Sequence, residues 1–423
     1  MSDKSEPLRD KRLMQHVRRR LVFYVGGFDP RGASYYHGLY SREAAKQAAV
    51  NGMRIETGPR KRAGRLVSHW KVHAHDAGGE VEADYCYLHW DDIVRARWTK
   101  NPLIVSAQAL SAFWFMVRTG ALKRFYRLSW PFALTAAYPF LQMVVTLLAA
   151  LIAGLVVYAG AAWLGQSPVW ANALVAIALG LGAGAFVLER AARANVFWIG
   201  RVTTVMSAFM REAIPEVEER AAALAGEIIA RRKTAETGPG CDEVVIVGHS
   251  VGADIATRII ARILELDPDF ASGSVPVSYL TLGQLVIFEA MPEGSPGFRQ
   301  DLAKVACAHG LTWIDFAAPA DPACIALVDP LKGSLIDRPA GAEIRPKLLS
   351  PRFPKLFAPE AYQKLRKEKM TMHFMYLQAT DIAGDYDYFA ITAGSRTLAA
   401  RYEHLDSNSK FDLLQGGILG GKT

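Results

Sequence analysis

The strongest chemical signal in this sequence is a serine that lies between a predicted strand and a predicted helix. Residues 243–256 read EVVIVGHSVGADIA, and the apolar run at 244–247 is typical of a short buried strand. Ser250 follows in a G-x-S-x-G turn, whose glycines leave room for a sharp bend that exposes the hydroxyl group, and a helix is predicted from Ala253. This pattern predicts that Ser250 is a nucleophile for acyl transfer. The alternative is an ordinary glycine-rich turn.

The turn resembles the nucleophile elbow of α/β-hydrolases, many of which also carry a histidine before the serine, here His249. A nucleophilic serine needs a base that accepts its proton, and the base needs a carboxylate that fixes its tautomer. The family order is Ser, then Asp or Glu, then His, so the resemblance implies that both partners follow Ser250 in the chain. The resemblance covers residues 21–92 and about 207–394.

The resemblance puts the acid just after a predicted strand at residues 311–317. Asp321, in the sequence APADP, follows this strand and resembles the D-P-V type turn of lipase-like members, so it is the favoured acid. Asp315 lies within the strand, where a structural role is more natural, and Asp329 is a third alternative. The choice between Asp321 and Asp315 stays open.

Three histidines follow the serine in the chain. His309 precedes the acid strand and so breaks the family order, and His404, in RYEH, is expected at a solvated helix end. His373, in MTMHFMY, lies among apolar residues after a lid-sized gap and is the favoured base, with a satisfied core histidine as the alternative. His249 belongs to the turn itself and is not the expected base.

The oxyanion of an acyl-transfer intermediate needs two preorganised N–H donors. One is expected from the backbone of Val251. The other is expected from the loop after the first strand, where the sequence GGF resembles the family's oxyanion loop, so Gly27 or Phe28 is the candidate. A plain turn is the alternative for these glycines. The acids at 91–92 either line the pocket or cap the next helix.

No metal or cofactor site is predicted. His69, His73 and His75 alternate onto one face of a predicted strand, but Lys71 shares this face, so a solvated polar surface is expected instead of a cation site. We find no P-loop, dinucleotide fingerprint or zinc-finger spacing. The four cysteines lie far apart without a C-x-x-C pair, which predicts reduced thiols.

A long uncharged segment at residues 128–188 precedes the elbow. It holds two lengths of about 20 apolar residues, enough to span a bilayer twice, so we expect a transmembrane hairpin with helices near 141–164 and 170–188. Lysine and arginine on both flanks, with an uncharged connecting turn, predict that both flanks are cytoplasmic. A buried helical pair is the alternative. The shorter apolar segment 103–117 is expected to form an interfacial or buried helix.

The remaining segments alternate between strands and helices. Upstream of the hairpin we expect a strand at 21–28, a helix capped by Ser41 at 41–50, and a β-hairpin of strands 65–75 and 81–90. Downstream, the predicted elements are a helix at 212–233, the elbow strand and helix, a strand at 275–282, a helix at 298–309 and the acid strand. The region 329–369 is expected to be an excursion or lid rather than part of the sheet.

Together these elements predict an α/β fold, with an α/β-hydrolase-like, mostly parallel sheet that is flanked by helices and interrupted by a two-helix transmembrane insertion. The expected organisation is a first part of this domain at 1–127, the hairpin at 128–190, a second part at 191–406, and a flexible tail at 407–423. Only about twenty residues precede the first strand, so the β-hairpin is expected to replace the family's leading antiparallel strands.

The composition agrees with a membrane setting. The chain has 423 residues, 51% of them hydrophobic, and a net charge of +8. Its basic residues lie at the N-terminus, beside apolar segments and in residues 345–369, which favours an anionic membrane over nucleic acid as the partner. Residues 1–20 lack an apolar segment, so no cleavable signal peptide is expected. The sequence does not predict the oligomeric state.

The leading prediction is therefore a multi-pass membrane protein with a cytoplasmic serine hydrolase domain. This domain is expected to cleave a carboxylic ester or thioester of a lipid through an acyl-enzyme intermediate. Ser250 attacks, His373 transfers the proton and Asp321 orients His373. The lipid preference rests on location and on the basic residues at 345–369. A peptidase or acyltransferase would use the same groups. The alternative from a different class is a catalytically silent hydrolase fold that acts as a membrane scaffold or partner-binding module.

Overall fold

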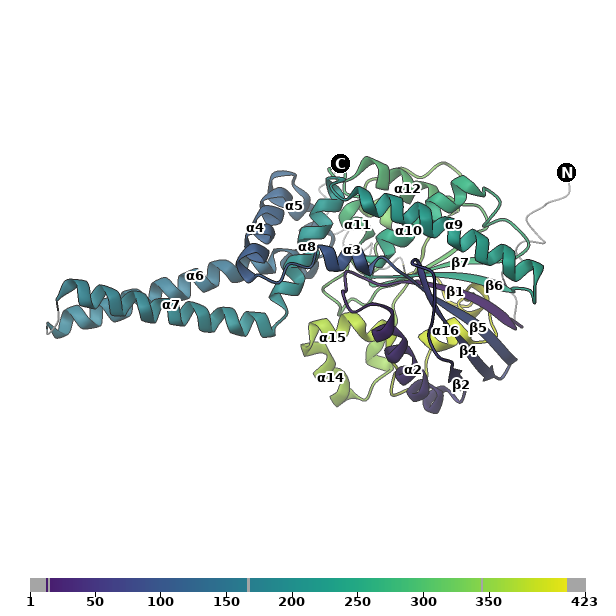
Figure 1. Ribbon diagram of the computed structural model, residues 1–423, viewed down its shortest axis with the longest axis horizontal. Coiled ribbons are helices and arrows are strands. Elements are labelled where there is room, and N and C mark those ends of the chain that lie inside the picture. The colour runs from purple at the N-terminus through teal and green to yellow at the C-terminus, as the bar shows by residue number, and fades with distance from the viewer. Residues whose placement is uncertain (1–12, 14–15, 166–167, 344, 409–423) are drawn as a thin grey trace. The chain divides into compact units, whose positions relative to one another are not determined.

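The computed structural model describes residues 13, 16–165, 168–343 and 345–408 (Figure 1). The predicted tail lies almost entirely outside these residues. The chain divides into two compact units. One holds the described residues before Thr99 and after Ser207, together with residues 127–129, and the other holds residues 99–126 and 130–207. The second unit is thus longer than the predicted insertion at 128–190, because flanking helices join it.

A mostly parallel sheet of nine strands is the centre of the first unit (Figure 1). Its order is β2-β4-β5-β1-β6-β7-β8-β9, and β3 pairs with β4. Neighbouring strands from β5 to β9 in this order are parallel, whereas β2, β3 and β5 are antiparallel to β4. The strands are β1 (Arg19–Val25), β2 (Arg54–Thr57), β3 (Lys61–Ala63), β4 (Val67–Asp76), β5 (Gly79–Leu88), β6 (Glu243–His249), β7 (Val277–Leu282), β8 (Thr312–Phe316) and β9 (Lys347–Leu349).

Helices cover both faces of this sheet. In Figure 1, α9 (Pro215–Thr237), α10 (Gly252–Leu266) and α12 (Pro296–Ala306) lie on one face, and α2 (Gly32–Asn51) and α16 (Tyr388–Ala393) on the other. This explains why β6 and β7 are buried along their whole length, since strands covered on both faces are apolar without alternation. The predicted β-hairpin is confirmed as the antiparallel pair of β4 and β5.

Shorter helices connect these layers. They are α3 (Asp91–Ala96), α11 (Val286–Glu289), α13 (Pro330–Gly333), α14 (Pro359–Lys367), α15 (Lys369–Phe374) and α17 (Leu398–Arg401), with 3₁₀ turns at η1 (Phe353–Lys355) and η2 (Met375–Leu377). The elements most important for the candidate site are the ends of β1, β6, β7 and β8 and the helix α15.

Two predictions about local structure were wrong. The helix expected from Ser41 begins at Gly32, because Asp29 accepts the backbone N–H of Arg31 and turns the loop into the helix early. Ser41 lies inside α2, where its Oγ donates to the carbonyl of His37 at 2.9 Å instead of capping a helix. The region 329–369 is not wholly outside the sheet, because β9 extends the sheet beyond β8.

The second unit contains two helices that are long and apolar enough to cross a membrane, α6 (Trp130–Leu164) and α7 (Val169–Arg193). A third span is possible by length and composition if α4 (Pro102–Arg118) and α5 (Ala121–Leu128), which meet at 81°, count as one bent element. The apolar helix α8 (Val196–Met210) is shorter. The first long helix begins eleven residues before the predicted position 141 and is 35 residues long, about 52 Å at 1.5 Å per residue.

Small residues let α6 and α7 pack closely. A side-chain carbon placed on Gly180 would lie 2.6 Å from the carbonyl oxygen of Ala150, and one on Gly184 would lie 3.1 Å from the Cβ of Ala150. Such glycine contacts are typical of helix pairs in membranes, where close backbone packing provides much of the attraction. Large apolar side chains such as Leu151, Leu155 and Leu179 are exposed on these helices, as expected for a surface that faces lipid.

Candidate active site

Ser250 lies on a strained turn between the end of β6 and the start of α10. Its φ is +56°, in the left-handed region that non-glycine residues rarely adopt. Its backbone N–H donates to the carbonyl of Leu282 at the end of β7, at 2.9 Å, which fixes the turn to the sheet. The side chain lies at the carboxyl ends of the parallel strands, where open α/β sheets bind ligands. Only 8% of the residue is exposed.

The two glycines of the G-x-S-x-G motif are required by sterics. A Cβ on Gly248 would lie 2.5 Å from the Cα of Ala253, where α10 turns back along β6. A Cβ on Gly252 would lie 2.2 Å from the carbonyl oxygen of Val25, at the end of the neighbouring strand β1. Both distances are below any normal contact, so no larger residue fits without a backbone shift.

The structure brings together Asp321 and His373, which are distant in the chain. His373 lies in α15, and its Nδ1–H donates to Oδ2 of Asp321 at 2.7 Å. Both residues are buried, at 6% and 2% exposure for His373 and Asp321. With Nδ1 occupied in this way, Nε2 of a neutral imidazole is the basic nitrogen.

Hydrogen bonds hold the Asp321 carboxylate in its charged form. Burial alone would raise its pKa, but the contacts with His373, the backbone N–H of Ala323 and the hydroxyl group of Tyr376 lower the pKa below its ordinary value. Ala323 N–H donates to Oδ1 at 2.9 Å, and the Tyr376 hydroxyl donates to Oδ2 at 3.1 Å. The carboxylate can therefore stabilise a positive charge on His373.

Ser250 and His373 are connected through two shared neighbours. His249 Nε2–H donates to the carbonyl of His373 at 2.9 Å, and the two imidazole rings lie 5.1 Å apart. Gly283 follows the carbonyl that binds the Ser250 N–H, and a Cβ on Gly283 would lie 3.3 Å from Cε1 of His373 and 3.2 Å from Oδ2 of Asp321. Within the described part of the chain, Ser250 Oγ makes no hydrogen bond to His373.

His249 is a neutral hydrogen-bond donor in this arrangement. Burial, followed by the neighbouring charge of His373, lowers the pKa of His249 to about 3. Its Nε2 carries the proton that binds the His373 carbonyl, and its buried Nδ1 has no partner among the described residues. An imidazole that stays uncharged at neutral pH is suited to holding the backbone of His373 in place and is unsuited to act as the base.

The candidate oxyanion donors lie next to the serine. A Cβ on Gly27 would lie 3.0 Å from the Cβ of Ser250 and 3.4 Å from its Oγ, so only glycine lets this loop approach so closely. Phe28 follows, buried against Trp90 and Trp98. Val251 is the N-cap of α10, and amides at the start of a helix have no partner within the helix. Backbone amides of Gly27, Phe28 and Val251 are thus within this small region.

The other candidate residues lie elsewhere. Asp315 is fully buried and accepts the hydroxyl group of Thr281 at 2.6 Å, and Asp329 caps α13. His309 is exposed in a loop, and His404 is exposed with its Nε2 3.9 Å from a carboxylate oxygen of Asp385. The acids at 91–92 begin α3 and form ion pairs with Arg95 and Arg220 respectively.

A cationic side chain lies close to His373. The guanidinium carbon of Arg31 lies 5.0 Å from the ring centroid of Phe374 and 3.8 Å from that of Tyr35, and its NH2 lies 2.5 Å from Oδ2 of Asp29. Burial lowers the pKa of Arg31, but Asp29 more than offsets this and raises the pKa overall. About a third of the Arg31 side chain, 34%, is exposed, so part of its charge faces solvent.

The histidine face of β4 contains ion pairs with the neighbouring strand. His69 Nδ1 lies 2.9 Å from Asp84, and Lys71 Nζ lies 2.7 Å from Glu82. No group of three or more His, Cys, Asp or Glu residues in the described ranges could hold a metal ion. The four cysteines are free thiols.

Sequence reasoning missed two side chains that position the histidine. Tyr376, in η2 directly after α15, donates to Asp321 and accepts the backbone N–H of Ala318 at 2.9 Å, so it ties this turn to the loop after β8. Its position three residues after His373 could have indicated a shared face. His249 was assigned to the turn and excluded as the base, but its bond to a backbone carbonyl is not visible in a sequence.

Comparison of the chain with protein-family models, with curated proteins and with solved structures gives no match, so the geometry of the site carries the functional argument alone.

Proposed function

We propose that this chain is a membrane-anchored serine hydrolase that cleaves a carboxylic ester or thioester of a lipid through an acyl-enzyme intermediate. Ser250 is the nucleophile, His373 is the general base and then the general acid, and Asp321 keeps the imidazole in the required tautomer. The backbone N–H of Val251 and that of Gly27 or Phe28 bind the oxyanion. The fold of this domain is, in this proposal, that of the α/β-hydrolases.

One observation carries this proposal: the buried bond between His373 and Asp321 lies beside a serine with φ of +56°. A left-handed serine on a strand-to-helix turn is costly and is typical of a nucleophile elbow. A buried imidazole paired with a carboxylate of lowered pKa is the arrangement that activates such a serine. The chain order Ser, Asp, His agrees with that of hydrolases built on this type of elbow.

In the proposed reaction, Ser250 Oγ attacks the acyl carbonyl as Nε2 of His373 takes the hydroxyl proton. The tetrahedral oxyanion is stabilised by the backbone donors, and its collapse breaks the C–O or C–S bond while His373 returns the proton to the leaving group. Water then repeats these steps on the acyl-enzyme and releases the carboxylic acid. The positive charge that forms on His373 is balanced by Asp321 throughout.

The preference for lipid is supported by apolar helices and by basic residues beside His373. Two helices are long and apolar enough to cross a membrane, and the positive residues on both flanks favour a cytoplasmic hydrolase domain. Of the basic residues at 345–369, Arg345 and Lys347 point inward, to the carbonyls of Ala308 and Tyr402. The exposed members are Arg352 and Lys355 at η1 and, on α14 and α15 close in sequence to His373, Lys364, Arg366, Lys367 and Lys369. Exposed lysines and arginines of this kind attract anionic lipid headgroups.

A second function is favoured by one observation, the lack of a hydrogen bond between Ser250 Oγ and His373 in the described residues. In a catalytically silent hydrolase fold, used as a membrane scaffold or partner-binding module, these side chains have no reason to converge. In active hydrolases such bonds are often long until substrate binds. The two functions differ in whether the serine reacts at all.

A hydrolysis assay tests the proposal. The full chain in detergent micelles is given p-nitrophenyl esters of increasing acyl length, the matching thioesters and a matching amide. We expect turnover of esters and thioesters that rises with chain length and is abolished in Ser250→Ala. Preferential turnover of the amide would indicate a peptidase, and equal activity in Ser250→Ala would contradict the proposal.

A further inference from the structure

A second cavity lies at the opposite end of the sheet from Ser250. It measures about 500 Å³ and is lined by residues before β1, at the turn from β4 to β5, and around α16 and α17. Because β1 and β5 are parallel, the start of β5 at Gly79 lies at the amino end of the strands, whereas the serine turn lies at the carboxyl end. The strand β1 has seven residues, so about 20 Å of sheet separates the two sites.

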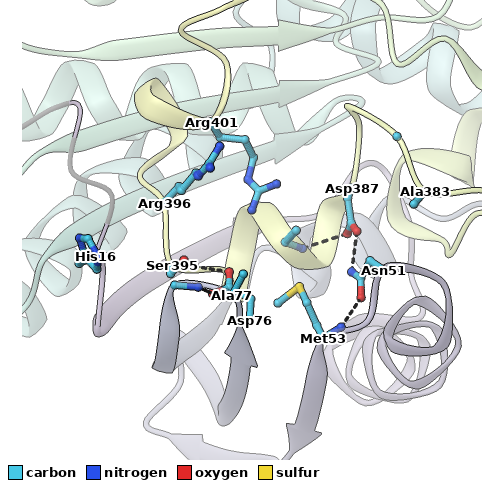
Figure 2. A pocket seen from close by; sticks show the side chains of 13 residues that line it. His16, Asn51, Met53, Asp76, Ala77, Ala383, Asp387, Ser395, Arg396 and Arg401 are labelled. Carbon is cyan, nitrogen blue, oxygen red and sulfur yellow. Dashed lines mark hydrogen bonds between the residues drawn. The ribbon is translucent and has the colours of Figure 1, made fainter.

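Two arginines and two aspartates line this cavity. Figure 2 shows Arg396 and Arg401 together with His16 on one side, and Asp387 and Asn51 on the other. Neither guanidinium group forms an ion pair or hydrogen bond within the described part of the chain, and the Nε of Arg401 is a buried donor without a partner. The buried Nε is closed off from the cavity, but both arginines line it, so their terminal N–H groups are the donors available to a ligand there.

The cavity carboxylates form no hydrogen bond with these arginines in the described residues, although, against the effect of burial, the charge of Arg401 contributes to lowering the pKa of Asp76. They accept hydrogen bonds from backbone and amide donors. Asp76 accepts the backbone N–H groups of Gly78 at 2.8 Å and Ser395 at 2.9 Å. Asp387 caps α16 and also accepts the side-chain amide of Asn51 at 2.7 Å. These bonds are drawn in Figure 2. The donors that remain for a ligand are therefore the cationic ones.

Glycines let the chain pack closely around these groups. A Cβ on Gly394 would lie 2.8 Å from the NH2 of Arg401, and a Cβ on Gly78 would lie 2.1 Å from the Oγ of Ser395. Larger residues at either position would displace the arginine or the turn that forms the wall. The cavity volume is in the range of small-molecule sites.

We propose that this cavity binds a small phosphate-bearing ligand, with the phosphate held by Arg396 and Arg401. Two guanidinium groups provide planar pairs of N–H donors and two positive charges, which match the geometry and charge of a phosphate dianion. Met53 and Ala390 provide an apolar surface for the remainder of the ligand. The site is separate from the serine and does not depend on its chemistry.

Titration calorimetry on the full chain in detergent tests this proposal, with inorganic phosphate and glycerol 3-phosphate as probes. We expect saturable binding that weakens by about tenfold or more in Arg396→Gln and in Arg401→Gln. Arg366→Gln, which removes an exposed arginine of α14, should bind as the wild type does. No saturable binding of either probe, or unchanged binding in both cavity variants, would overturn the proposal.

Two further arms make the result specific. Arg396 is exposed, so Arg396→Gln should keep the fold and decides the outcome if Arg401→Gln does not fold. Nanodiscs that contain phosphatidic acid, compared with soluble glycerol 3-phosphate, distinguish a lipid headgroup from a free phosphate ester as the source. Ser250→Ala should bind the probes unchanged, so a failure of the proposed hydrolase activity is distinguishable from a failure of this site.

Discussion

The Nδ1–H of His373 donates to Oδ2 of Asp321 across 2.7 Å, although the two residues are separated by 52 positions in the chain. The bond is buried, and Tyr376 donates to the same carboxylate oxygen. Asp315, the other candidate acid, lies one strand position away from the end of β8 and binds Thr281 instead. This arrangement gives the two aspartates different roles.

Asp321→Asn should therefore lower kcat for ester hydrolysis by about 10³-fold or more, because the amide cannot fix the tautomer or balance the charge on His373. Asp315→Asn is the matched control and should change kcat by less than about tenfold, since Asp315 does not contact the histidine. Steady-state kinetics with a common ester give both values. Equal losses in the two variants would contradict the assignment of Asp321.

His249→Leu should lower kcat by about tenfold with little change in KM, because the bond to the His373 carbonyl positions the base and not the substrate. His249→Gln keeps an N–H donor at this place and should recover most of the rate. Equal kcat values for His249→Leu and His249→Gln would argue against a positioning role for His249. A change confined to KM would argue against it as well.

Gly252→Ala should reduce the free energy of unfolding by about 3 kcal/mol or more, because the new methyl group would lie 2.2 Å from the Val25 carbonyl. Gly226→Ala is the control, since nothing lies within 4 Å of that position on α9. Alanine in a helix is favoured over glycine by about 0.5 to 1 kcal/mol, so this variant should be slightly more stable. Thermal denaturation of both proteins in one detergent provides the comparison.

Asp315 should make stability depend on pH. Burial, partly offset by the bond from Thr281 and by the nearby side-chain amide of Gln284, raises the pKa of Asp315 to about 7. The folded state thus favours the protonated form, so this contribution to stability is complete below the unfolded value near 4 and is lost as the pH rises through 7. Between pH 5 and 8 the wild type should lose about 2 to 3 kcal/mol relative to Asp315→Asn. The apparent Tm of the wild type and of Asp315→Asn is measured across this pH range. Tm values that change in parallel in the two proteins would exclude this effect.

The proposed membrane topology puts residues before α6 and after α7 on the cytoplasmic side. In bacterial cells, alkaline phosphatase fused after Gly165 should be active, whereas the same enzyme fused after Arg193 should be inactive, because it matures only outside the cytoplasm. The reverse pattern would invert the orientation, and two inactive fusions would show that the helix pair does not cross the membrane.

Much of the fold was predictable because its signals are local. The apolar run before Ser250 predicted β6, and the turn between β4 and β5 predicted their antiparallel pairing. The start of α2 was not predictable from a capping pattern, since Asp29 sets it through a bond to the Arg31 backbone. The three-residue strand β9 was missed because a segment this short has no periodicity and depends on its neighbour β8.

The candidate site was predictable in its residue types but not in its contacts. The order of Ser250, Asp321 and His373 came from a resemblance, whereas the pairing of His373 with Asp321 and not with Asp315 depends on the three-dimensional position of α15. The support from Tyr376 and His249 involves a backbone N–H and a backbone carbonyl, which have no sequence signature. The arginine cavity combines residues from five places in the chain, so no single motif indicates it.

Covalent labelling of Ser250 by a fluorophosphonate probe tests the central claim most directly, because the probe reacts with serines that a neighbouring base has activated. The full chain in detergent should gain the mass of one phosphonyl group, peptide mapping should locate it on Ser250, and His373→Ala should slow the labelling strongly. Label that persists in Ser250→Ala would contradict the assignment of the nucleophile. An unlabelled wild type that is folded by its thermal transition would favour the catalytically silent fold.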